Sequence, residues 1–280
     1  NLMLADASFV AIDNILNEKP LPERQKLNIP ENTEISLNDV SFWYEEGVKA
    51  IDHISMTIKP GTVTALVGES GGGKSTVANL IARFWDVSDG SVTVGGVDVR
   101  DLDYSNLMKH ISVVFQDTNL FKMSVAENVA MYKPGASRKE ILEALQQARC
   151  EDILEKLPNG MDSVIGAKGV YLSGGEMQRI ALARAILKDA PIVLLDEATA
   201  FADAENEYLI QKALDVLLKG KTVLMIAHRL STVANADCIY VVRDGQIAES
   251  GTKDELCAQN GLFARMWQEY QASVQWKVAK

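Results

Sequence analysis

A glycine-rich segment between a short apolar run and a helix-like pattern constrains this chain most. Residues 68–75 read Gly-Glu-Ser-Gly-Gly-Gly-Lys-Ser. They fit G-x-x-x-x-G-K-[ST], whose backbone N–H groups and lysine cradle the phosphates of a nucleoside triphosphate. The run Thr62–Val67 before the segment predicts a strand, and the apolar spacing of Ser75–Phe84 after it predicts a helix. A plain glycine turn before a helix is the weaker alternative, because both flanks match the motif.

The residue types of this segment suit phosphate binding. Its glycines, at positions 68 and 71–73, allow positive φ angles and close backbone approach. Successive N–H groups can therefore converge on phosphate oxygens at a helix N-terminus, which already favours anions. Lys74 is expected to reach the β and γ phosphates, and Ser75 is expected to offer its hydroxyl to Mg²⁺.

A second constellation follows a predicted buried strand. The apolar run Ile192–Leu195 ends in Asp196 and Glu197, and such a run is typical of a strand buried on both faces of a parallel sheet. Carboxylates at its C-terminal end lie where open α/β sheets bind ligands. Asp196 is expected to hold the magnesium shell, and Glu197 to polarise the attacking water. An acidic turn after a buried strand is the alternative for this pair taken alone.

A third segment identifies a family. Leu172-Ser173-Gly174-Gly175-Glu176 precedes the helix-like stretch from Met177 to Ala185. A serine and two glycines opening a helix direct a hydroxyl, N–H groups and the helix dipole toward an anion. With the two motifs above, this segment resembles the nucleotide-binding domain of an ATP-binding cassette transporter. An ordinary helix cap would explain the tripeptide alone, but not its place ahead of Asp196.

The resemblance implies further site residues. Gln116 matches the glutamine that contacts Mg²⁺ and the catalytic water, and His228 matches the histidine that contacts the γ-phosphate. Tyr44 matches the aromatic residue that stacks on adenine, although Phe42 or Trp43 could do so in a shifted register; aromatic faces suit flat purines. Taken without the resemblance, Gln116 is only a polar residue at the end of a strand. A lone histidine after an apolar strand, such as His228, is more often structural than functional.

The expected roles follow from the resemblance. The catalytic residues are Glu197, His228 and Lys74, and the magnesium ligands are Ser75, Gln116 and Asp196. The expected ATP-binding residues are Tyr44, Gly68, Glu69, Ser70, Gly71, Gly72, Gly73, Lys74, Ser75, Thr76 and Gln116. The signature residues, which act on the ATP of a second subunit, are Ser173, Gly174, Gly175 and Glu176.

Composition agrees with this reading. A chain of 280 residues with 47% hydrophobic content can bury a substantial core. The three cysteines, Cys150, Cys238 and Cys257, are scattered and odd in number, which favours a reducing compartment without a disulfide framework or zinc site. The net charge of −10 argues against a nucleic-acid partner, because phosphate backbones need clustered Lys and Arg.

The chain reads as two regions. No run of about 18 apolar residues is present, but Asn1–Asn17 has the spacing of an amphipathic helix. By the resemblance, residues 1–33 are the cytoplasmic end of a transmembrane-domain helix followed by the proline-containing linker from Lys19 to Thr33. An ordinary N-terminal helix is the alternative. Residues 34–280 are the expected nucleotide-binding domain, with a helical subdomain at about 119–190.

The predicted fold class is α/β: a P-loop NTPase core with a parallel sheet, an antiparallel β-subdomain and an inserted α-helical subdomain. Ile35–Thr64 is expected to be strand-rich, Gly90–Val99 to form a hairpin turning at Gly95-Gly96, and Arg138–Leu157 to be the clearest amphipathic helical stretch. A turn at 243–246 and a helical tail over Lys253–Ser273 complete the pattern.

Two departures from the family pattern concern the coupling between the two ATP sites and the contact with the membrane domain. After Glu197 the family often reads Ala-Thr-Ser-Ala-Leu-Asp, whereas residues 198–203 here read Ala-Thr-Ala-Phe-Ala-Asp. This loop crosses the dimer interface in the family, and the Phe-Ala-Asp form is similar to that of exporter-fold transporters linked to iron siderophores, some of which import. Ile165-Gly166-Ala167-Lys168-Gly169 also lacks an acidic residue found in exporters, which implies an altered contact with the membrane domain.

The resemblance implies an ATPase that powers transport across a membrane by ATP-driven dimerisation. Its expected cofactors are ATP and Mg²⁺, and its expected partners are a second nucleotide-binding domain and a transmembrane domain fused at the N-terminus. The expected location is the cytoplasmic face of the cell membrane. The alternative is a soluble cassette ATPase associated with ribosomes or DNA, which would carry two such domains or a long coiled coil. A metabolic kinase would lack Leu172–Glu176.

Overall fold

The computed structural model describes most of the chain after the first 30 residues. The predicted N-terminal helix and most of the linker lie outside the described residues, apart from a few positions among which 12–13 and 16–17 are helical. The described residues are 12–13, 16–17, 21–22, 28, 30–45, 47–115, 118–166, 170–196, 204–227 and 230–278.

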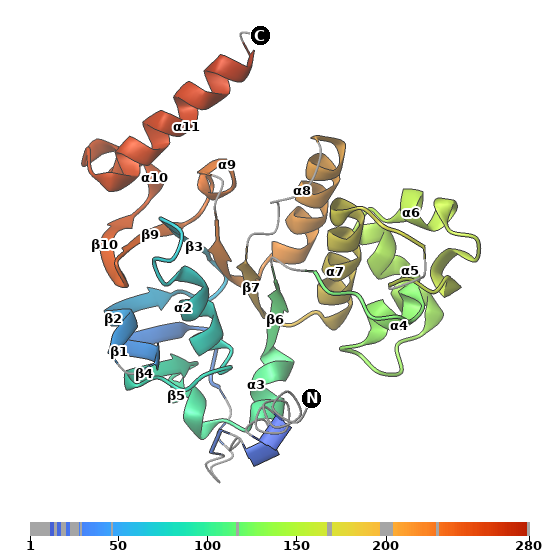
Figure 1. The fold of residues 1–280 in the computed structure, drawn as a ribbon, viewed down its shortest axis with the longest axis horizontal. Coiled ribbons are helices and arrows are strands. Elements are labelled where there is room, and N and C mark those ends of the chain that lie inside the picture. Colours follow the sequence, from blue (N-terminus) through green and yellow to red (C-terminus); the bar gives the residue numbers. More distant parts are fainter. Residues whose placement is uncertain are drawn as a thin grey trace, which may run out of the picture.

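A six-stranded sheet forms the centre of the molecule (Figure 1). Its strands, in spatial order, are β10 (Gln246–Gly251), β9 (Cys238–Arg243), β3 (Val63–Gly68), β8 (Thr222–Ile226), β7 (Ile192–Asp196) and β6 (Ile111–Val114). All neighbouring pairs are parallel except β9 and β10, which turn at the predicted position after Arg243. The carboxyl ends of β3, β8, β7 and β6 therefore lie along one edge.

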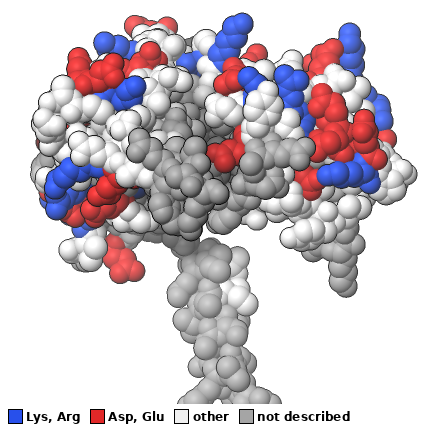
Figure 2. All heavy atoms as spheres, turned by 90° about the horizontal axis from the view of Figure 1, so that it is seen from above, with Lys and Arg blue, Asp and Glu red and all other residues white. Residues whose placement is uncertain are grey.

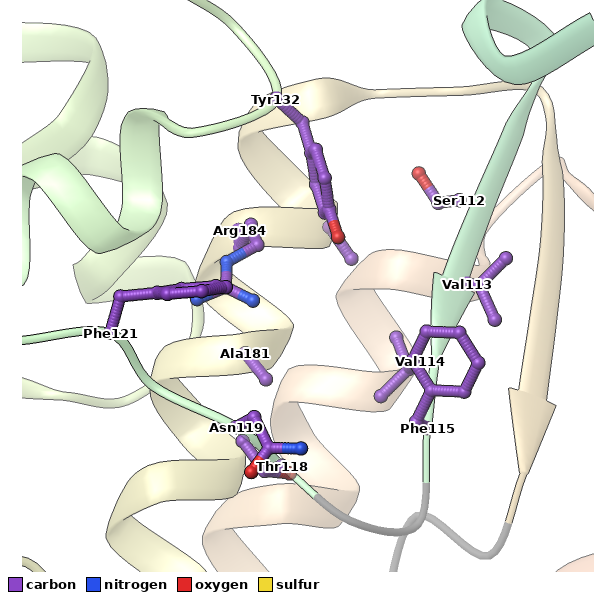
Figure 3. A pocket seen from close by; sticks show the side chains of 11 residues that line it. Ser112, Val113, Val114, Phe115, Thr118, Asn119, Phe121, Tyr132, Ala181 and Arg184 are labelled. Atoms are coloured by element: carbon purple, nitrogen blue, oxygen red, sulfur yellow. The ribbon is translucent and has the colours of Figure 1, made fainter. Parts of the chain in front are cut away.

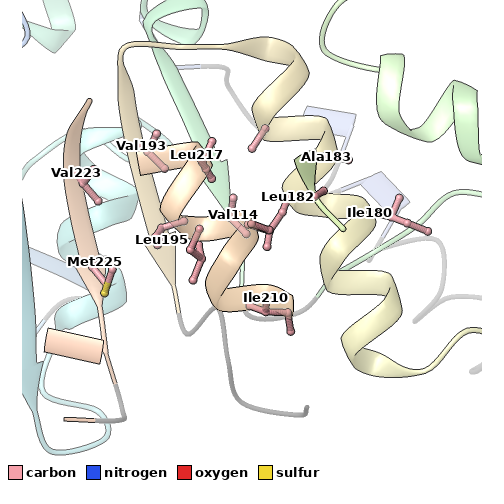
Figure 4. Close-up of a cluster of buried hydrophobic side chains, with 14 of the residues drawn as sticks. Val114, Ile180, Leu182, Ala183, Val193, Leu195, Ile210, Leu217, Val223 and Met225 are labelled. Carbon is pink, nitrogen blue, oxygen red and sulfur yellow. The ribbon is translucent and has the colours of Figure 1, made fainter. Parts of the chain in front are cut away.

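Alternation along each central strand divides the interior into two cores. In β7, Val193 and Leu195 belong to one core, whereas Ile192 and Leu194 belong to the other. Figure 4 shows the first core, where side chains of β6, β7 and β8 meet those of α7 and α8. Because both faces are covered, the central strands β3, β8, β7 and β6 are largely apolar, as expected for a parallel sheet.

The second core lies under an antiparallel sheet and one helix. The strands, in order, are β2 (Val48–Ile58), β1 (Ile35–Glu45), β4 (Asp89–Val94) and β5 (Val97–Asp98). They pack with α2 (Lys74–Ile81) on the same face of the central sheet. The predicted hairpin at Gly95-Gly96 is confirmed by the antiparallel pairing of β4 and β5. A short turn η1 (Val99–Asp101) and α3 (Tyr104–His110) lead into β6.

Helices cover the other face. The predicted amphipathic stretch from Arg138 is two helices, because Arg149 adopts a positive φ of 59° that ends the first of them. Ser124 and Ser137 each form a capping box at a helix start, the pairing that satisfies exposed backbone N–H groups. The elements are α4 (Val125–Ala130), α5 (Arg138–Gln147), α6 (Glu151–Lys156), η2 (Gly160–Asp162), α7 (Gly174–Lys188) and α8 (Ala204–Leu218).

The predicted helical tail is also divided. After α9 (Leu230–Val233) and the strands β9 and β10 come α10 (Lys253–Ala258) and α11 (Leu262–Val278). Glu249 accepts hydrogen bonds from the backbone N–H groups of Leu262 and Phe263, so its carboxylate caps a new helix rather than letting α10 continue. Within the described ranges, no helix is both long and apolar enough to cross a lipid bilayer. The predicted α/β fold class is confirmed.

Candidate functional site: a phosphate loop and a helix cap on opposite faces of the sheet

The glycine-rich segment lies between β3 and α2, as the sequence predicts. Gly73 is the N-cap of α2 with φ 98°, and Gly71 has φ 79°. A Cβ at Gly73 would lie 2.5 Å from the carbonyl oxygen of Ala50, and one at Gly68 would lie 2.0 Å from that of Val242. Neither position can hold a side chain without moving the neighbouring backbone, so the loop requires glycine at both.

Lys74 closes the loop from the inside. Its Nζ donates to the carbonyl oxygens of Gly68 at 3.0 Å and Glu69 at 2.7 Å, and the residue is only 4% exposed. The lysine charge is therefore held among loop carbonyls at the start of α2, where the helix dipole also favours an anion. Ser75 is exposed beside it, as are Glu69 and Ser70.

Tyr44 reaches this region from the end of β1. Its hydroxyl shares a 3.2 Å hydrogen bond with that of Thr76, the third residue of α2. Tyr44 is 47% exposed, whereas Phe42 is 3% exposed and lies in the core. Trp43, the third candidate, is partly buried, so Tyr44 is the most exposed of the three. Trp85, which the sequence interpretation missed, packs edge to face with Tyr44 at a centroid distance of 5.3 Å.

The other predicted residues follow strand ends at the same edge as the loop. Asp196 ends β7 and is partly buried. Gln116, Glu197 and His228 lie outside the described residues. Their preceding neighbours are placed at this edge, since Phe115 follows β6 and Ala227 after β8 donates its backbone N–H to Leu66 of β3 at 3.1 Å.

Ser173 begins α7 with a complete capping box. Its hydroxyl accepts from the N–H of Glu176 at 3.2 Å, and its own N–H donates to the Glu176 carboxylate at 2.8 Å. Lys156 donates to the same carboxylate at 3.0 Å. Burial acts to raise the pKa of Glu176, but the hydrogen bonds from Ser173 and Lys156 outweigh it and leave the pKa below its usual range.

Close packing fixes the start of α7 against α8. A Cβ on Gly175 would lie 2.8 Å from Cβ and Cγ of Asn206. Only a residue without a side chain permits this approach. Gly174 is the first residue of α7 and is partly exposed, so the helix start presents hydroxyl and backbone groups at the surface.

The glycine-rich loop of residues 68–75, here called the phosphate loop after its predicted role, and Ser173–Glu176, the predicted signature segment, lie on different sides of the sheet. The apolar residues of α2 belong to the core under the antiparallel sheet, whereas those of α7 belong to the other core. Figure 1 shows α2 and α7 on opposite sides of β6 and β7. The geometry therefore brings Lys74, Ser75, Thr76 and Tyr44 together, with Asp196 at the same sheet edge, and leaves Ser173–Glu176 apart from them.

A cavity of about 400 Å³ lies beside the C-terminal end of β6 (Figure 3). Phe115 and Val114 line one side, and Phe121, Tyr132 and Arg184 line the other. Arg184 is buried and donates to the carbonyl oxygen of Asn128 at 2.9 Å; burial lowers the pKa of its guanidinium. This cavity lies beside β6 and α7 and is distinct from the glycine-rich loop between β3 and α2.

Acidic and basic side chains are interspersed over the face drawn in Figure 2. No continuous basic area is visible among the described residues on that face. The charge distribution there is that of an ordinary solvated surface with an acidic excess, consistent with the net charge of −10.

Comparisons with known proteins agree with the geometry. The family model described as "ABC transporter" matches residues 51–200. The mycobactin import ATP-binding/permease protein IrtA of Mycolicibacterium thermoresistibile is 50% identical over 233 residues, which are 83% of this chain and 26% of that protein. An ATP-dependent lipid A-core flippase of Vibrio cholerae is 48% identical over 237 residues, which are 84% of this chain and 41% of that protein.

Comparison with solved structures also matches this chain to an ABC exporter. The solved structure of a bacterial Atm1-family ABC exporter with ATP bound matches with a TM-score of 0.85 and 34% identity, covering 96% of this chain and 47% of that one. This chain therefore spans less than half the length of each of these three relatives. The motifs, the fold and the match over residues 51–200 together establish that the chain belongs to the ABC transporter family.

Proposed function

We propose that this chain is the ATP-binding and ATP-hydrolysing part of a membrane transporter. The observation that carries the proposal is Lys74, held by two loop carbonyls inside a glycine loop at the start of α2. A buried lysine at the N-terminus of a helix, beside a glycine loop that allows close backbone approach, is suited to the β and γ phosphates of a nucleotide.

Different residues of one chain bind the phosphates, the adenine and the Mg²⁺ ion. Residues 68–76 hold the phosphates, and the half-exposed ring of Tyr44 stacks on the adenine. Ser75, Gln116 and Asp196 hold Mg²⁺, since hydroxyl, amide and carboxylate oxygens are the donors this ion prefers. When bound, Mg²⁺ neutralises charge on the phosphates. Glu197 polarises the attacking water, and His228 contacts the γ-phosphate.

The site is completed by a second subunit. Ser173–Glu176 begin α7 on the other face of the sheet from α2, so they are poorly placed to reach the phosphate loop of their own chain. A second copy, or a related domain, turned head to tail would bring the helix start of one subunit to the nucleotide of the other. Two ATP molecules are then enclosed per dimer, and hydrolysis reopens it.

Transport requires a membrane domain, which we propose is fused ahead of residue 34. Residues 1–33 are then the end of its last helix and a linker, and the protein lies at the cytoplasmic face of the membrane. The relatives' names describe import in one case and a flippase in another, so the match to this region alone selects neither the direction of transport nor its substrate. The soluble-cassette alternative receives less support, because these relatives are transporters.

The proposal is tested by ATP turnover of the purified protein and of Glu197→Gln, with size-exclusion chromatography in ATP and Mg²⁺. The variant is expected to bind ATP, lose turnover and accumulate as a dimer, because hydrolysis no longer reopens it. Glu143→Gln, on an exposed side of α5, is the matched control and should keep wild-type turnover. Wild-type turnover in Glu197→Gln would refute the assigned role of Glu197.

A further inference from the structure

Three aromatic side chains meet beside the phosphate loop. Phe42 and Tyr44 come from β1, and their rings are 4.8 Å apart at 88°. Trp85 comes from the segment after α2 and lies 5.3 Å from Tyr44 at 90° and 6.0 Å from Phe42. Both contacts of Tyr44 are edge to face, an arrangement that aromatic pairs prefer, whereas the Phe42–Trp85 pair is tilted at 57°. The three side chains are here called the aromatic cluster.

The cluster holds Tyr44 at its ring, and Thr76 holds it at its hydroxyl. Phe42 is almost fully buried and forms the inner wall of the cluster. Thr76 is 7% exposed and is the second residue after Lys74 in α2. The hydrogen bond between Tyr44 and Thr76 therefore joins the aromatic cluster to the helix that carries the phosphate loop.

The outer part of the cluster remains open. Tyr44 is 47% exposed and Trp85 is 44% exposed, although each packs against other rings. An aromatic side chain at a strand end samples several rotamers when nothing supports it, and a ligand must then bear the cost of ordering it. Trp85 removes part of that freedom before a base arrives.

We propose that Trp85 is a positioning residue for base recognition: it fixes the ring of Tyr44 beside α2 so that a purine stacks on a preformed surface. This inference rests on the proposed function, in which Tyr44 receives the base. Trp85 and Thr76 together hold the stacking ring at a fixed position beside α2. Trp85 should therefore contribute to the binding of the base and leave the binding of the phosphates unchanged.

Comparing ATP with inorganic tripolyphosphate separates the contribution of the base from that of the phosphates. ATP and inorganic tripolyphosphate, each with Mg²⁺, are titrated into the intact chain and its variants by calorimetry. Trp85→Ala should weaken ATP binding by about three- to ten-fold, the size of an aromatic pairing contribution, with tripolyphosphate binding unchanged. Trp85→Phe should retain most of the affinity for ATP, because it keeps an aromatic edge. Thr76→Val should weaken ATP binding because it removes the hydroxyl that holds Tyr44.

A second aromatic cluster supplies the matched control. Trp267 of α11 stacks on Phe263 at 6.0 Å and contacts Tyr270. Trp267→Phe should leave ATP and tripolyphosphate affinities unchanged. Fluorescence gives an independent readout: ATP, but not tripolyphosphate, should change the emission of the wild type, and Trp85→Phe should lose that change while Trp267→Phe keeps it.

The outcomes distinguish this proposal from the one on which it rests. Equal weakening of ATP and tripolyphosphate in folded Trp85→Ala or Trp85→Phe would overturn the positioning role, as would ATP binding that neither substitution alters. If the wild type binds tripolyphosphate but gains nothing from the base, the positioning role fails while the phosphate loop stands. If the wild type binds neither ligand, the proposed function itself fails.

Discussion

Replacing Gly73 by alanine should lower the free energy of unfolding through two separate effects. The first is conformational, since φ is 98° at this position, and a positive φ costs an L-residue about 1–2 kcal/mol. The second is steric. The new Cβ would lie 2.5 Å from the carbonyl oxygen of Ala50 and 2.8 Å from Cδ1 of Ile51. Overpacking of this kind adds about 1–3 kcal/mol. Gly73→Ala should therefore lower the free energy of unfolding by about 2–5 kcal/mol.

Gly71 provides the comparison within the same loop. It also has a positive φ, 79°, but a Cβ there meets nothing within 4 Å. Gly71→Ala should lose only the conformational part, about 1–2 kcal/mol. The difference between the two variants isolates the contact between the loop and β2.

Urea unfolding of both variants and the wild type measures these costs, and ATP titration shows whether the loop has moved. If the loop shifts to relieve the contact, Gly73→Ala will be less destabilised than expected but will bind ATP more weakly, by about ten-fold for each 1.4 kcal/mol so avoided. Equal unfolding free energies and equal ATP affinities for Gly71→Ala and Gly73→Ala would refute the reasoning.

Two further predictions concern helix starts. Ser173→Ala removes the cap of α7 and should cost about 0.5–2 kcal/mol of stability, measured by urea unfolding. ATP binding by the single chain should stay unchanged. Added to Glu197→Gln, the substitution should weaken the ATP-dependent dimer seen by chromatography, and an unaltered dimer would contradict the role of the signature. Glu140 accepts from Lys133 and from Ser137, which lowers its pKa from 4.5 to about 2. Because this pKa is lower in the folded protein, its stabilising effect is complete above about pH 4.5 and is lost as the pH falls toward 2. Glu140→Gln should flatten that part of a pH–stability curve, and an identical curve would show that the carboxylate contributes nothing.

Local signals in the sequence predicted the elements that flank the phosphate loop. The apolar run before Gly68 is β3, and the run before Asp196 is β7, with ends close to those expected. Both follow from short-range patterns, namely buried strands rich in branched residues and glycines at a helix start. The helix after the loop was expected to reach Phe84, but it ends at Ile81.

Tertiary contacts explain that early end. Arg83 has a positive φ of 53°, and its buried guanidinium donates to the carbonyl oxygens of Leu102 and Pro22. Such partners lie far away in the sequence, so helical periodicity does not reveal them. The division of the C-terminal tail has the same origin, since Glu249 of β10 caps α11 from outside the helix.

The arrangement of the candidate site was only partly accessible to sequence reasoning. Motifs predicted which residues matter, but they do not give the faces on which α2 and α7 pack. Trp85 carries no local signal, because its importance arises only when β1 and the segment after α2 lie side by side. The choice among Phe42, Trp43 and Tyr44 likewise depends on burial, which leaves Phe42 in the core and Tyr44 half exposed.

The central claim is that the phosphate loop of one subunit works with the signature segment of another. It is tested most directly by mixing Lys74→Ala with Ser173→Ala and measuring ATP hydrolysis; each variant alone is expected to lack turnover, because both sites of its own dimer carry the lesion. A mixed dimer contains one site with both lesions and one intact site, because each site takes Lys74 from one chain and Ser173 from the other. The account predicts that an equal mixture regains about a quarter of wild-type activity, since half of its dimers are mixed. Activity no greater than that of the separate variants would contradict it.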